Sequence, residues 1–386
     1  MDQYCEVVLV GAGASGLLCG SLLGSQGLPV TILEKNNRVG RKLSATGNGR
    51  CNFTNLHMDA ACYYGESSWI RQILGQVGAE EVIRLFQDYG IWYRQKDGYV
   101  YPHTNQASTV VDLLHQSCLE NKVEIRTDCP AQSVERSGDG YFRIQTTEGY
   151  IKCKVLVMAT GGKAGKETGG DGSGYPLLQD LGHHVTALYP GLTGLVCGGG
   201  CWNRVAGTRI QGSFSLKIDG REAEGEQGEI QIVKKGVSGI PVFQLCRVAA
   251  EALAQGKKVE GVIDFVPSMK REDTSLWLRY HGLEGLIPKK WIPLAQRETD
   301  PVSFLKAFSF PIRETFGMDR AQVTAGGVPL SEVCVDTMES LLQDQLYLLG
   351  ELLDVDGKCG GYNLHLAWST ALLAAREITR RSRENH

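Results

Sequence analysis

One stretch near the amino terminus restricts the fold more than any other part of the chain. Residues 4–35 read YCEVVLVGAGASGLLCGSLLGSQGLPVTILEK. Residues 6–10 predict a strand buried on both faces of a parallel sheet, and the glycines that follow have the spacing G-x-G-x-x-G. A helix over 14–26 and a second strand over 29–34 complete a β–α–β unit. This order predicts an α/β domain with a parallel sheet that binds a dinucleotide.

Each part of this unit has a chemical role. Gly11 permits the tight turn, Gly13 lets the backbone approach a diphosphate, and Gly16 lets the helix pack closely on the strand. The helix start offers free N–H groups and a partial positive charge to the diphosphate. Glu34, at the end of the second strand, is placed to accept hydrogen bonds from an adenosine ribose. An acid at this position favours FAD or NAD over NADP.

Length and charge restrict the remaining possibilities. A chain of 386 residues suggests about two or three domains, and its 48 glycines cluster in short runs typical of cofactor-binding loops. A formal charge of −3 argues against a nucleic-acid surface or an anionic membrane as partner. The twelve cysteines are scattered, which is typical of reduced thiols in a cytoplasmic protein.

The apolar start of the chain has two possible interpretations. Residues 7–33 contain no charged side chain, as a signal sequence or a membrane span would. However, the leading MDQYCE is acidic where a signal peptide is basic, and glycines and a proline interrupt the run. We therefore expect a cytoplasmic protein with no membrane partner.

Three further segments favour FAD over NAD. Residues 40–55 read GRKLSATGNGRCNFTN, an open and polar run directly after the second strand. Residues 150–162 form an apolar strand that breaks at small residues, and residues 344–378 contain a strand, a glycine-rich loop and a long helix. These segments lie at both ends of the chain, whereas an NAD fold completes its site within one contiguous half. Flavoproteins with two dinucleotide-binding parts return at the carboxyl terminus to close over the flavin.

The order of these motifs is similar to that of one family. The motifs are GAGASGL, GRKLSATGNGRCNFTN, ATGGK, AGGV and GELLDVDGKCGGYN. In this order they resemble the HI0933-like flavoproteins, also labelled BaiN-type NAD(P)/FAD-dependent oxidoreductases. The resemblance implies an α/β fold: a two-dinucleotide-binding, Rossmann-like FAD domain with an inserted antiparallel β-barrel and a small helical domain. The expected boundaries are 1–194 and 321–386 for the FAD domain, 195–268 for the barrel and 269–320 for the helical domain.

The resemblance also implies a set of FAD contacts. Many FAD enzymes carry Gly-Asp where this chain has Gly350-Glu351, so the contact made by the longer acid is open. Carried over position by position, the contacts are Gly11, Gly13, Ala14, Ser15, Gly16, Glu34, Lys35, Arg41, Lys42, Gly49, Arg50, Cys51, Ala159, Thr160, Gly161, Gly350, Glu351, Asp354, Gly361, Tyr362 and Asn363.

The open run has a predicted role at this site. Arg41, Lys42 and Arg50 would surround the diphosphate and the flavin edge, while small residues let the chain pass against the ring. A solvated basic loop is the alternative. Cys51 is either a redox thiol or, as we expect without a partner cysteine, a packing residue. The helix that begins near Asn363 would direct its N-terminus toward the N1–C2=O edge of the flavin.

The electron donor and the proton donor are less defined. No second strand–GxGxxG–helix unit is present in the sequence, so NADH or NADPH would dock on the exposed flavin face, or the donor is another molecule. Tyr101, His103 and Tyr362 are candidate proton donors, since phenols and imidazoles can protonate carbon. For each, a structural role is the alternative.

The leading functional hypothesis is an FAD-dependent oxidoreductase. It would reduce an activated C=C bond of an apolar enone, such as a 3-oxo bile acid or a steroid, with hydride from NAD(P)H. A flavin oxidase acting on a small amine is one alternative. An FAD-dependent RNA-modifying protein is another, against which the negative charge counts. The oligomeric state is not predicted, and no metal is expected.

Overall fold

The chain divides into two compact units. The computed structural model describes residues 3–384. One unit combines the chain up to residue 188 with the chain from residue 323 onward, and the other comprises residues 189–322. The head and the tail of the sequence therefore fold together, with a separate unit inserted between them.

A seven-stranded sheet forms the centre of the first unit. Its order is β7-β2-β1-β10-β9-β8, and β19 also pairs with β10. Strands β7, β2, β1, β10 and β19 pair in parallel, whereas β9 pairs antiparallel with β10 and β8 pairs antiparallel with β9. The bounds are β1 Gln3–Val10, β2 Val30–Leu33, β7 Glu124–Arg126, β8 Ser133–Arg136, β9 Phe142–Thr146, β10 Gly149–Met158 and β19 Leu346–Leu348. The predicted parallel sheet is confirmed.

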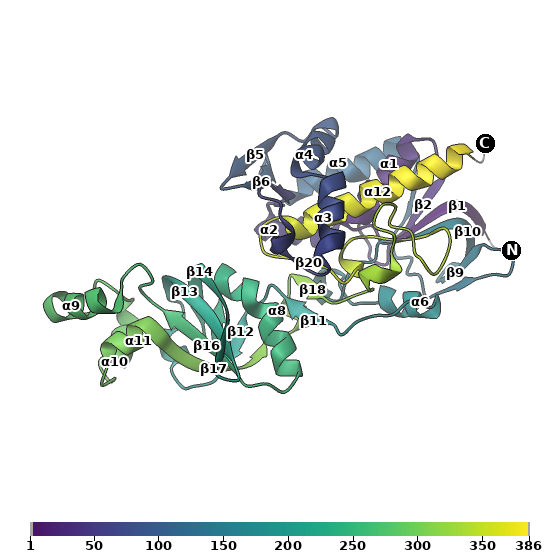
Figure 1. Cartoon of the computed structure of the whole chain (residues 1–386). Helices are drawn as coiled ribbons and strands as arrows, with labels where there is room; N and C mark the ends of the chain where they lie inside the picture. The colour runs from purple at the N-terminus through teal and green to yellow at the C-terminus, as the bar shows by residue number, and fades with distance from the viewer. Residues whose placement is uncertain (1–2, 385–386) are drawn as a thin grey trace. The chain divides into compact units, whose positions relative to one another are not determined.

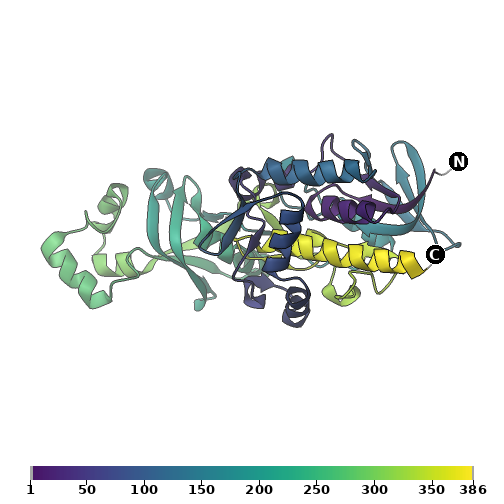
Figure 2. The same ribbon diagram turned by 90° about the horizontal axis from the view of Figure 1, so that it is seen from above.

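Three long helices accompany this sheet. They are α1 (Ala14–Ser25), α5 (Ala107–Glu120) and α12 (Tyr362–Glu384). α1 packs against both of the others, and the two views show the three side by side (Figure 1, Figure 2). Gly20 also lets α1 lie close to the sheet, because a Cβ added there would lie 2.6 Å from the side chain of Ile32 on β2. The carboxyl-terminal helix thus lies beside the first helix of the chain.

Shorter elements complete the first unit. Two small antiparallel sheets pair β3 with β6 and β6 with β5, and β20 with β4. Their bounds are β3 Thr54–Asn55, β4 Tyr63–Tyr64, β5 Tyr93–Lys96, β6 Tyr99–Pro102 and β20 Asp356–Gly357; β18 is Val323–Ala325. The helices are α2 Arg41–Gly49, α3 Ser67–Gln76, α4 Ala79–Asp88 and α6 Gly174–Asp180, and the 3₁₀ turns are η1 Ala60–Cys62, η2 Lys166–Thr168, η5 Leu330–Glu332 and η6 Gly350–Leu352.

The second unit contains a closed barrel with the order β12-β15-β14-β13-β16-β17. This confirms the predicted antiparallel barrel. Its strands, together with the short β11, are β11 Tyr189–Gly191, β12 Leu195–Cys197, β13 Arg209–Ile218, β14 Arg221–Val233, β15 Gly236–Ser238, β16 Val259–Asp264 and β17 Phe308–Thr315. The helices and 3₁₀ turns of the unit are α7 Trp202–Val205, α8 Ile240–Ala254, α9 Arg271–His281, η3 Lys289–Trp291, α10 Ile292–Ala295, α11 Pro301–Ala307 and η4 Met318–Arg320.

The barrel and the helices after residue 268 share one hydrophobic core. Trp291, Phe304 and Leu305 from the helical part belong to the same buried cluster as the barrel residues Phe214 and Phe310. The structure thus places the barrel and the helical segment in one unit, whereas the sequence predicts two domains that meet at residue 268. The unit boundaries lie at 188/189 and 322/323, against the expected 194/195 and 320/321.

Two local features complete the description of the fold. Residues 308–315 form barrel strand β17, although the sequence places them in the helical domain. No helix within residues 3–384 combines the length and apolar character needed to cross a bilayer.

Candidate functional site

The turn after β1 has the geometry that a dinucleotide-binding loop needs. Gly11 has φ of +107°, and a Cβ there would lie 2.4 Å from the carbonyl oxygen of Ala159. A Cβ on Gly16 would lie 1.9 Å from the carbonyl oxygen of Gly11, so α1 packs this close only because residue 16 is glycine. Gly13, by contrast, faces open space at the start of α1. Free N–H groups beside this opening suit a diphosphate.

Glu34 is buried behind this turn, with 6 % of its surface exposed. Its Oε2 accepts a hydrogen bond from the backbone N–H of Ala12 at 2.8 Å. Its Oε1 accepts from the backbone N–H of Asn36 at 2.9 Å and from the amide of the same residue at 2.5 Å. Since a carboxylate has roughly four acceptor positions, one remains for a ribose hydroxyl. Glu34 therefore holds the turn in shape, and its contact with ribose stays a prediction.

A glycine-rich segment is bonded to the end of β2. Lys35 pairs with Asp171. The guanidinium of Arg41 donates to the side-chain oxygen of Asn36 at 2.7 Å and to the carbonyl oxygen of Glu167 at 2.7 Å. Lys35 and Arg41, both predicted cofactor contacts, therefore hold residues 167–171 beside the predicted adenosine position.

Lys42 and Glu351 form an ion pair across more than 300 positions of sequence. The Nζ atom of Lys42 lies 2.7 and 2.8 Å from the two carboxylate oxygens. Glu351 Oε1 also accepts from the backbone N–H of Thr324 at 2.9 Å and from its hydroxyl at 3.0 Å. A Cβ on the neighbouring Gly350 would lie 3.2 Å from the hydroxyl of Ser15 at the start of α1. The longer acid of the Gly-Glu pair thus joins the head, the tail and β18 in one network.

The residues after β10 lie at the same edge of the sheet. The hydroxyl of Thr160 is buried and has no hydrogen-bond partner among residues 3–384. The hydroxyl of Tyr175, at the start of α6, is likewise buried and unpaired within the described chain. Gly161 has φ of +69° and faces open space. Asp354, the remaining predicted acid, accepts a hydrogen bond from the hydroxyl of Thr186 at 3.0 Å.

The start of α12 is held open by a tight turn. Asn363 accepts a hydrogen bond from the N–H of Gly357 at 2.8 Å and donates one to its carbonyl oxygen at 2.7 Å. The amide of Asn55 donates to the carbonyl oxygen of Gly360 at 2.8 Å. Gly361 has φ of +93°, and a Cβ there would lie 2.7 Å from the carbonyl oxygen of Thr54. The first N–H groups of this long helix stay available for an electron-rich group.

The polar run at 40–55 is partly helical, where the sequence predicts an open loop. Helix α2 begins at Arg41, and its dihedral angles become non-helical over residues 46–48. Leu43 is 2 % exposed and anchors this helix, which explains why the run is not fully open. Gly49 has φ of +80° and faces open space, and Arg50 is exposed. Cys51 is fully buried, and burial raises the pKa of its thiol to about 12, which favours packing over redox chemistry.

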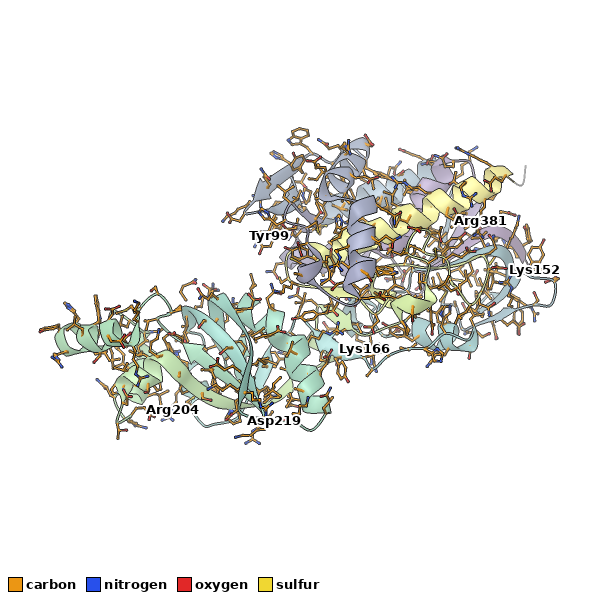
Figure 3. All side chains as sticks on the ribbon, in the orientation of Figure 1. Tyr99, Lys152, Lys166, Arg204, Asp219 and Arg381 are labelled. Carbon is orange, nitrogen blue, oxygen red and sulfur yellow. The ribbon has the colours of Figure 1, made fainter. Side chains whose placement is uncertain are left out.

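The candidate proton donors are in different environments. Tyr101 is half-buried on β6, and the Arg94 guanidinium lies 5.5 Å from its ring centroid. Burial raises the pKa of Tyr101, while the positive charge of Arg50 opposes that rise. Tyr99, labelled in Figure 3, is two residues away on the same strand and so faces the same side of the small sheet. His103 is exposed in the turn that follows β6.

Tyr362 is more constrained than Tyr101. Its hydroxyl donates to the carbonyl oxygen of His57 at 3.3 Å, and its ring meets Tyr63 edge-on with centroids 5.7 Å apart. Burial raises the pKa of Tyr362 above its usual range. Tyr99 and Tyr362 lie beside the start of α12, because a Cβ on Gly360 would lie 2.9 Å from the Tyr362 ring and 3.1 Å from the Tyr99 ring. Tyr101 is two residues along β6 from Tyr99.

These features fit FAD. The open faces at Gly13, Gly49 and Gly161 leave room for a ligand at the edge of the parallel sheet. The free helix ends suit a diphosphate and an electron-rich ring edge, and the two unpaired hydroxyls suit the polar chain of a dinucleotide. Among residues 3–384, no group of three or more His, Cys, Asp or Glu side chains is arranged to hold a metal ion.

Sequence reasoning missed several residues of this site. Asn36 and Thr324 bond to the predicted acids Glu34 and Glu351, and Tyr175 has an unpaired hydroxyl and interacts with the charge of Glu351. Only Thr324 had a local signal, since it directly precedes the AGGV motif.

Comparisons with known proteins agree with this geometry. The family described as HI0933-like protein Rossmann domain matches residues 5–377. A 3-dehydro-bile acid delta(4,6)-reductase of Clostridium scindens is 37 % identical over 407 residues, which cover 97 % of this chain and 99 % of the relative. A ribosomal RNA dihydrouridine synthase of Haemophilus influenzae is 28 % identical, with 98 % of this chain and 100 % of the relative covered.

The fold recurs in solved structures. A 3-ketosteroid-delta4-(5alpha)-dehydrogenase from Rhodococcus jostii RHA1, in complex with 4-androstene-3,17-dione, superposes with a TM-score of 0.56 at 14 % identity. The match covers 98 % of this chain and 96 % of that one, and at this identity it shows the fold alone. From the family match and the 37 % identical relative, the chain belongs to the HI0933-like family, and it is an oxidoreductase built on a Rossmann-type FAD domain.

Proposed function

We propose that this protein reduces a C=C bond conjugated with a carbonyl group in an apolar, steroid-like substrate, such as a 3-oxo bile acid, with NADH or NADPH as reductant. The observation that carries the proposal is the 37 % identical bile acid reductase, which aligns over nearly the full length of both chains. The overall reaction would convert the enone, NAD(P)H and one proton into the saturated ketone and NAD(P)⁺. FAD, when bound, supplies the two-electron chemistry of this reaction.

The residues of the chain have distinct roles in this proposal. The glycine turn after β1 and the start of α1 bind the diphosphate, and Glu34 faces the ribose. Lys42, Glu351 and Thr324 hold the segments on either side of the cofactor together. The start of α12 stabilises negative charge at the pyrimidine edge of the flavin, because its N–H groups and dipole are positive there.

Tyr101 is our choice among the three candidate proton donors. A proton must reach the α-carbon of the enone, and a phenol can supply it if the resulting phenolate is stabilised. Burial raises the pKa of Tyr101, and the charges of Arg50 and Arg94 oppose that rise, whereas the groups around Tyr362 raise its pKa further. His103 is exposed, and the Tyr362 hydroxyl already donates to a backbone carbonyl.

Anaerobic stopped-flow absorbance tests the reaction class. Protein reduced by light would be mixed with a 4-en-3-one steroid, a 4,6-dien-3-one bile acid or oxygen. Fast reoxidation by either enone supports the proposal, whereas reoxidation by oxygen alone supports an oxidase and contradicts it. Parallel mixing of oxidised protein with NADH and with NADPH identifies the donor.

The Tyr101→Phe variant tests the proton donor. It should reoxidise about a hundredfold more slowly with enones, since general acids contribute roughly 10²-fold or more. Its reduction by NAD(P)H should be unchanged, because that step needs no proton at carbon. Tyr280→Phe, at a position 70 % exposed on α9, is the matched control. Equal enone rates in both variants would remove Tyr101 from this role.

A second candidate substrate is uridine in ribosomal RNA. The observation that favours it is the 28 % identical dihydrouridine synthase, aligned over 98 % of this chain. The uracil C5=C6 bond is also conjugated with a carbonyl group, so the same site chemistry would serve. The formal charge of −3 counts against RNA, whose binding depends on cations. Reoxidation by an unmodified ribosomal RNA fragment, but not by enones, would favour this substrate.

The location of the protein also remains a proposal. We expect a cytoplasmic protein without membrane or nucleic-acid partners, and no oligomeric state is proposed.

A further inference from the structure

Four buried polar side-chain atoms have no hydrogen-bond partner among residues 3–384. They are Nε1 of Trp69 and the hydroxyl oxygens of Thr160, Tyr175 and Tyr347. A buried hydroxyl without a partner destabilises the folded chain, and folded proteins leave few such groups. Each therefore needs an explanation, and a bound ligand is one.

Two of the four lie together beside the predicted cofactor site, and one of them, Thr160, is a predicted contact. Thr160 lies two residues after the end of β10, and α6 begins at Gly174. A Cβ on Gly174 would lie 1.9 Å from the hydroxyl oxygen of Thr160, so only glycine lets α6 come this close. Tyr175 is the next residue and is 4 % exposed. Both residues therefore lie at the carboxyl edge of the sheet, where Gly11 also contacts the segment after β10.

The charges around Tyr175 indicate what kind of group it would bind. Burial raises the pKa of its phenol most, and the negative charges of Glu351 and Asp354 raise it further. Glu351 also lies beside this segment, since a Cβ on Gly162 would be 2.8 Å from its Oε1. Both are already engaged, Glu351 with Lys42 and Asp354 with Thr186. Two carboxylates repel a phosphate, which only accepts hydrogen bonds. A hydroxyl group fits better, since it can accept from Tyr175 and donate to a carboxylate.

We propose that Tyr175 is a cofactor-binding residue whose hydroxyl pairs with a hydroxyl of the ribityl chain of FAD. The inference rests on the FAD site of the proposed function. FAD carries two polyol parts, the ribityl chain and the adenosine ribose, and Glu34 is the residue assigned to the ribose. The negative charge of Glu351 raises the pKa of Tyr175. The neighbouring Gly350 lies beside Ser15 at the start of α1, so these residues extend the site beyond the diphosphate turn.

Two matched variants test this proposal. Tyr175→Phe and Tyr347→Phe each remove one unpaired, buried hydroxyl and leave the ring in place. Tyr347 lies on β19, is fully buried, and has Glu339, Arg381 and Glu377 as its charged neighbours, none of them a predicted cofactor contact. In the cofactor-free protein, both variants should unfold at the same temperature as the wild type or at a higher one.

FAD binding should separate the two variants. Fluorescence titration of the cofactor-free proteins should give a dissociation constant roughly three- to tenfold weaker for Tyr175→Phe and unchanged for Tyr347→Phe, the loss expected for one hydrogen bond. ADP contains the adenosine ribose and the diphosphate but no ribityl chain, so its affinity should be the same in all three proteins. The rise in unfolding temperature caused by FAD should be smaller in Tyr175→Phe.

Other outcomes overturn the proposal in distinguishable ways. Equal FAD affinities for wild type and Tyr175→Phe, or equal losses in both variants, remove Tyr175 from the site. Weaker binding of ADP to Tyr175→Phe assigns the contact to the adenosine half and contradicts the ribityl contact. If the wild type does not bind FAD, this inference and the proposed function both fail. If FAD binds as expected and no enone reoxidises the reduced protein, only the proposed function fails.

Discussion

Glu34 combines a structural role with a predicted ligand contact. Its two oxygens accept hydrogen bonds from the backbone N–H groups of Ala12 and Asn36, on either side of the cofactor turn. In Glu34→Gln, one of these N–H groups faces an amide donor, so we expect the cofactor-free protein to lose about 1–3 kcal/mol of unfolding free energy. FAD affinity should fall at least about tenfold, because the turn and the ribose acceptor are both altered.

Urea unfolding and FAD titration measure these two effects separately. Glu120→Gln, on the exposed surface of α5, serves as the control and should change neither. A loss of stability at unchanged FAD affinity would mean that Glu34 only shapes the turn.

His365 makes stability depend on pH. The ring is fully buried in α12, and burial lowers its pKa from 6.5 to about 4. It is therefore neutral in the folded chain: Nε2–H donates to the carbonyl oxygen of Val77 at 3.0 Å, and Nδ1 accepts from the hydroxyl of Thr54 at 2.8 Å. The unfolded chain takes up a proton at this residue below about pH 6.5. Stability is then complete above pH 6.5 and falls toward pH 4, by about 3 kcal/mol at most.

The pH dependence of urea unfolding between pH 8 and pH 4 checks this. In His365→Gln the protein should be less stable at pH 8, yet its stability should fall less steeply between pH 6.5 and 4. His103→Gln, at an exposed position, should keep the steep wild-type dependence. A steep dependence in His365→Gln would assign it to other groups.

At the scale of elements, the start of α12 depends on one side chain. Asn363 binds both the N–H and the carbonyl oxygen of Gly357, and so closes the loop that leads into the helix. Asn363→Ala removes both bonds, and we expect a loss of about 1–3 kcal/mol in thermal unfolding of the cofactor-free protein. The affinity for FAD should also fall, and by more than the lower stability of the fold accounts for. The reason is that the N–H groups at the start of the helix are no longer held in place.

The matched control is an asparagine at an exposed position outside this loop. Asn37→Ala, exposed just after β2, should leave the thermal transition unchanged. Unaltered stability in Asn363→Ala would show that the loop closes without this residue.

The elements of the fold differ in how far the sequence could predict them. The β–α–β unit at the amino terminus was predictable because its strand, its glycines and its terminal acid are local and mutually consistent. Helix α2 was not: residues 41–49 are mostly polar, and only packing of the buried Leu43 stabilises them as a helix. Strand β17 was also missed, since it contains Pro311 and directly follows helical segments, while its pairing partners β12 and β16 lie far away in sequence.

The residues of the candidate site also divide into those that the sequence could predict and those that it could not. Its glycines and acids have local signals, because turns and close approaches need particular residues. The partners Asn36, Thr324 and Tyr175 acquire their roles only when distant segments meet, as Lys42 and Glu351 do across 309 positions. Spacing along a chain cannot indicate such contacts.

At the scale of the whole molecule, the inserted unit has a core of its own. Within residues 189–322, Trp291 is fully buried and meets Phe265 edge-on with ring centroids 5.1 Å apart. Its indole N–H donates to the hydroxyl of Thr208 at 3.0 Å. A closed barrel also leaves few unpaired strand edges that would need another part of the chain. We therefore expect the fragment 189–322 to fold without the rest of the protein.

Expression of this fragment alone provides the test, followed by heating under tryptophan fluorescence and near-ultraviolet circular dichroism. A single cooperative transition, with buried tryptophan emission before it, is the expected result. Trp291→Ala should abolish or strongly lower the transition, because losing a buried tryptophan costs about 3–5 kcal/mol. The fragment should not bind FAD, since every predicted contact lies outside it. Gradual, non-cooperative melting of the unaltered fragment would instead mean that its core needs the FAD-binding unit in order to form.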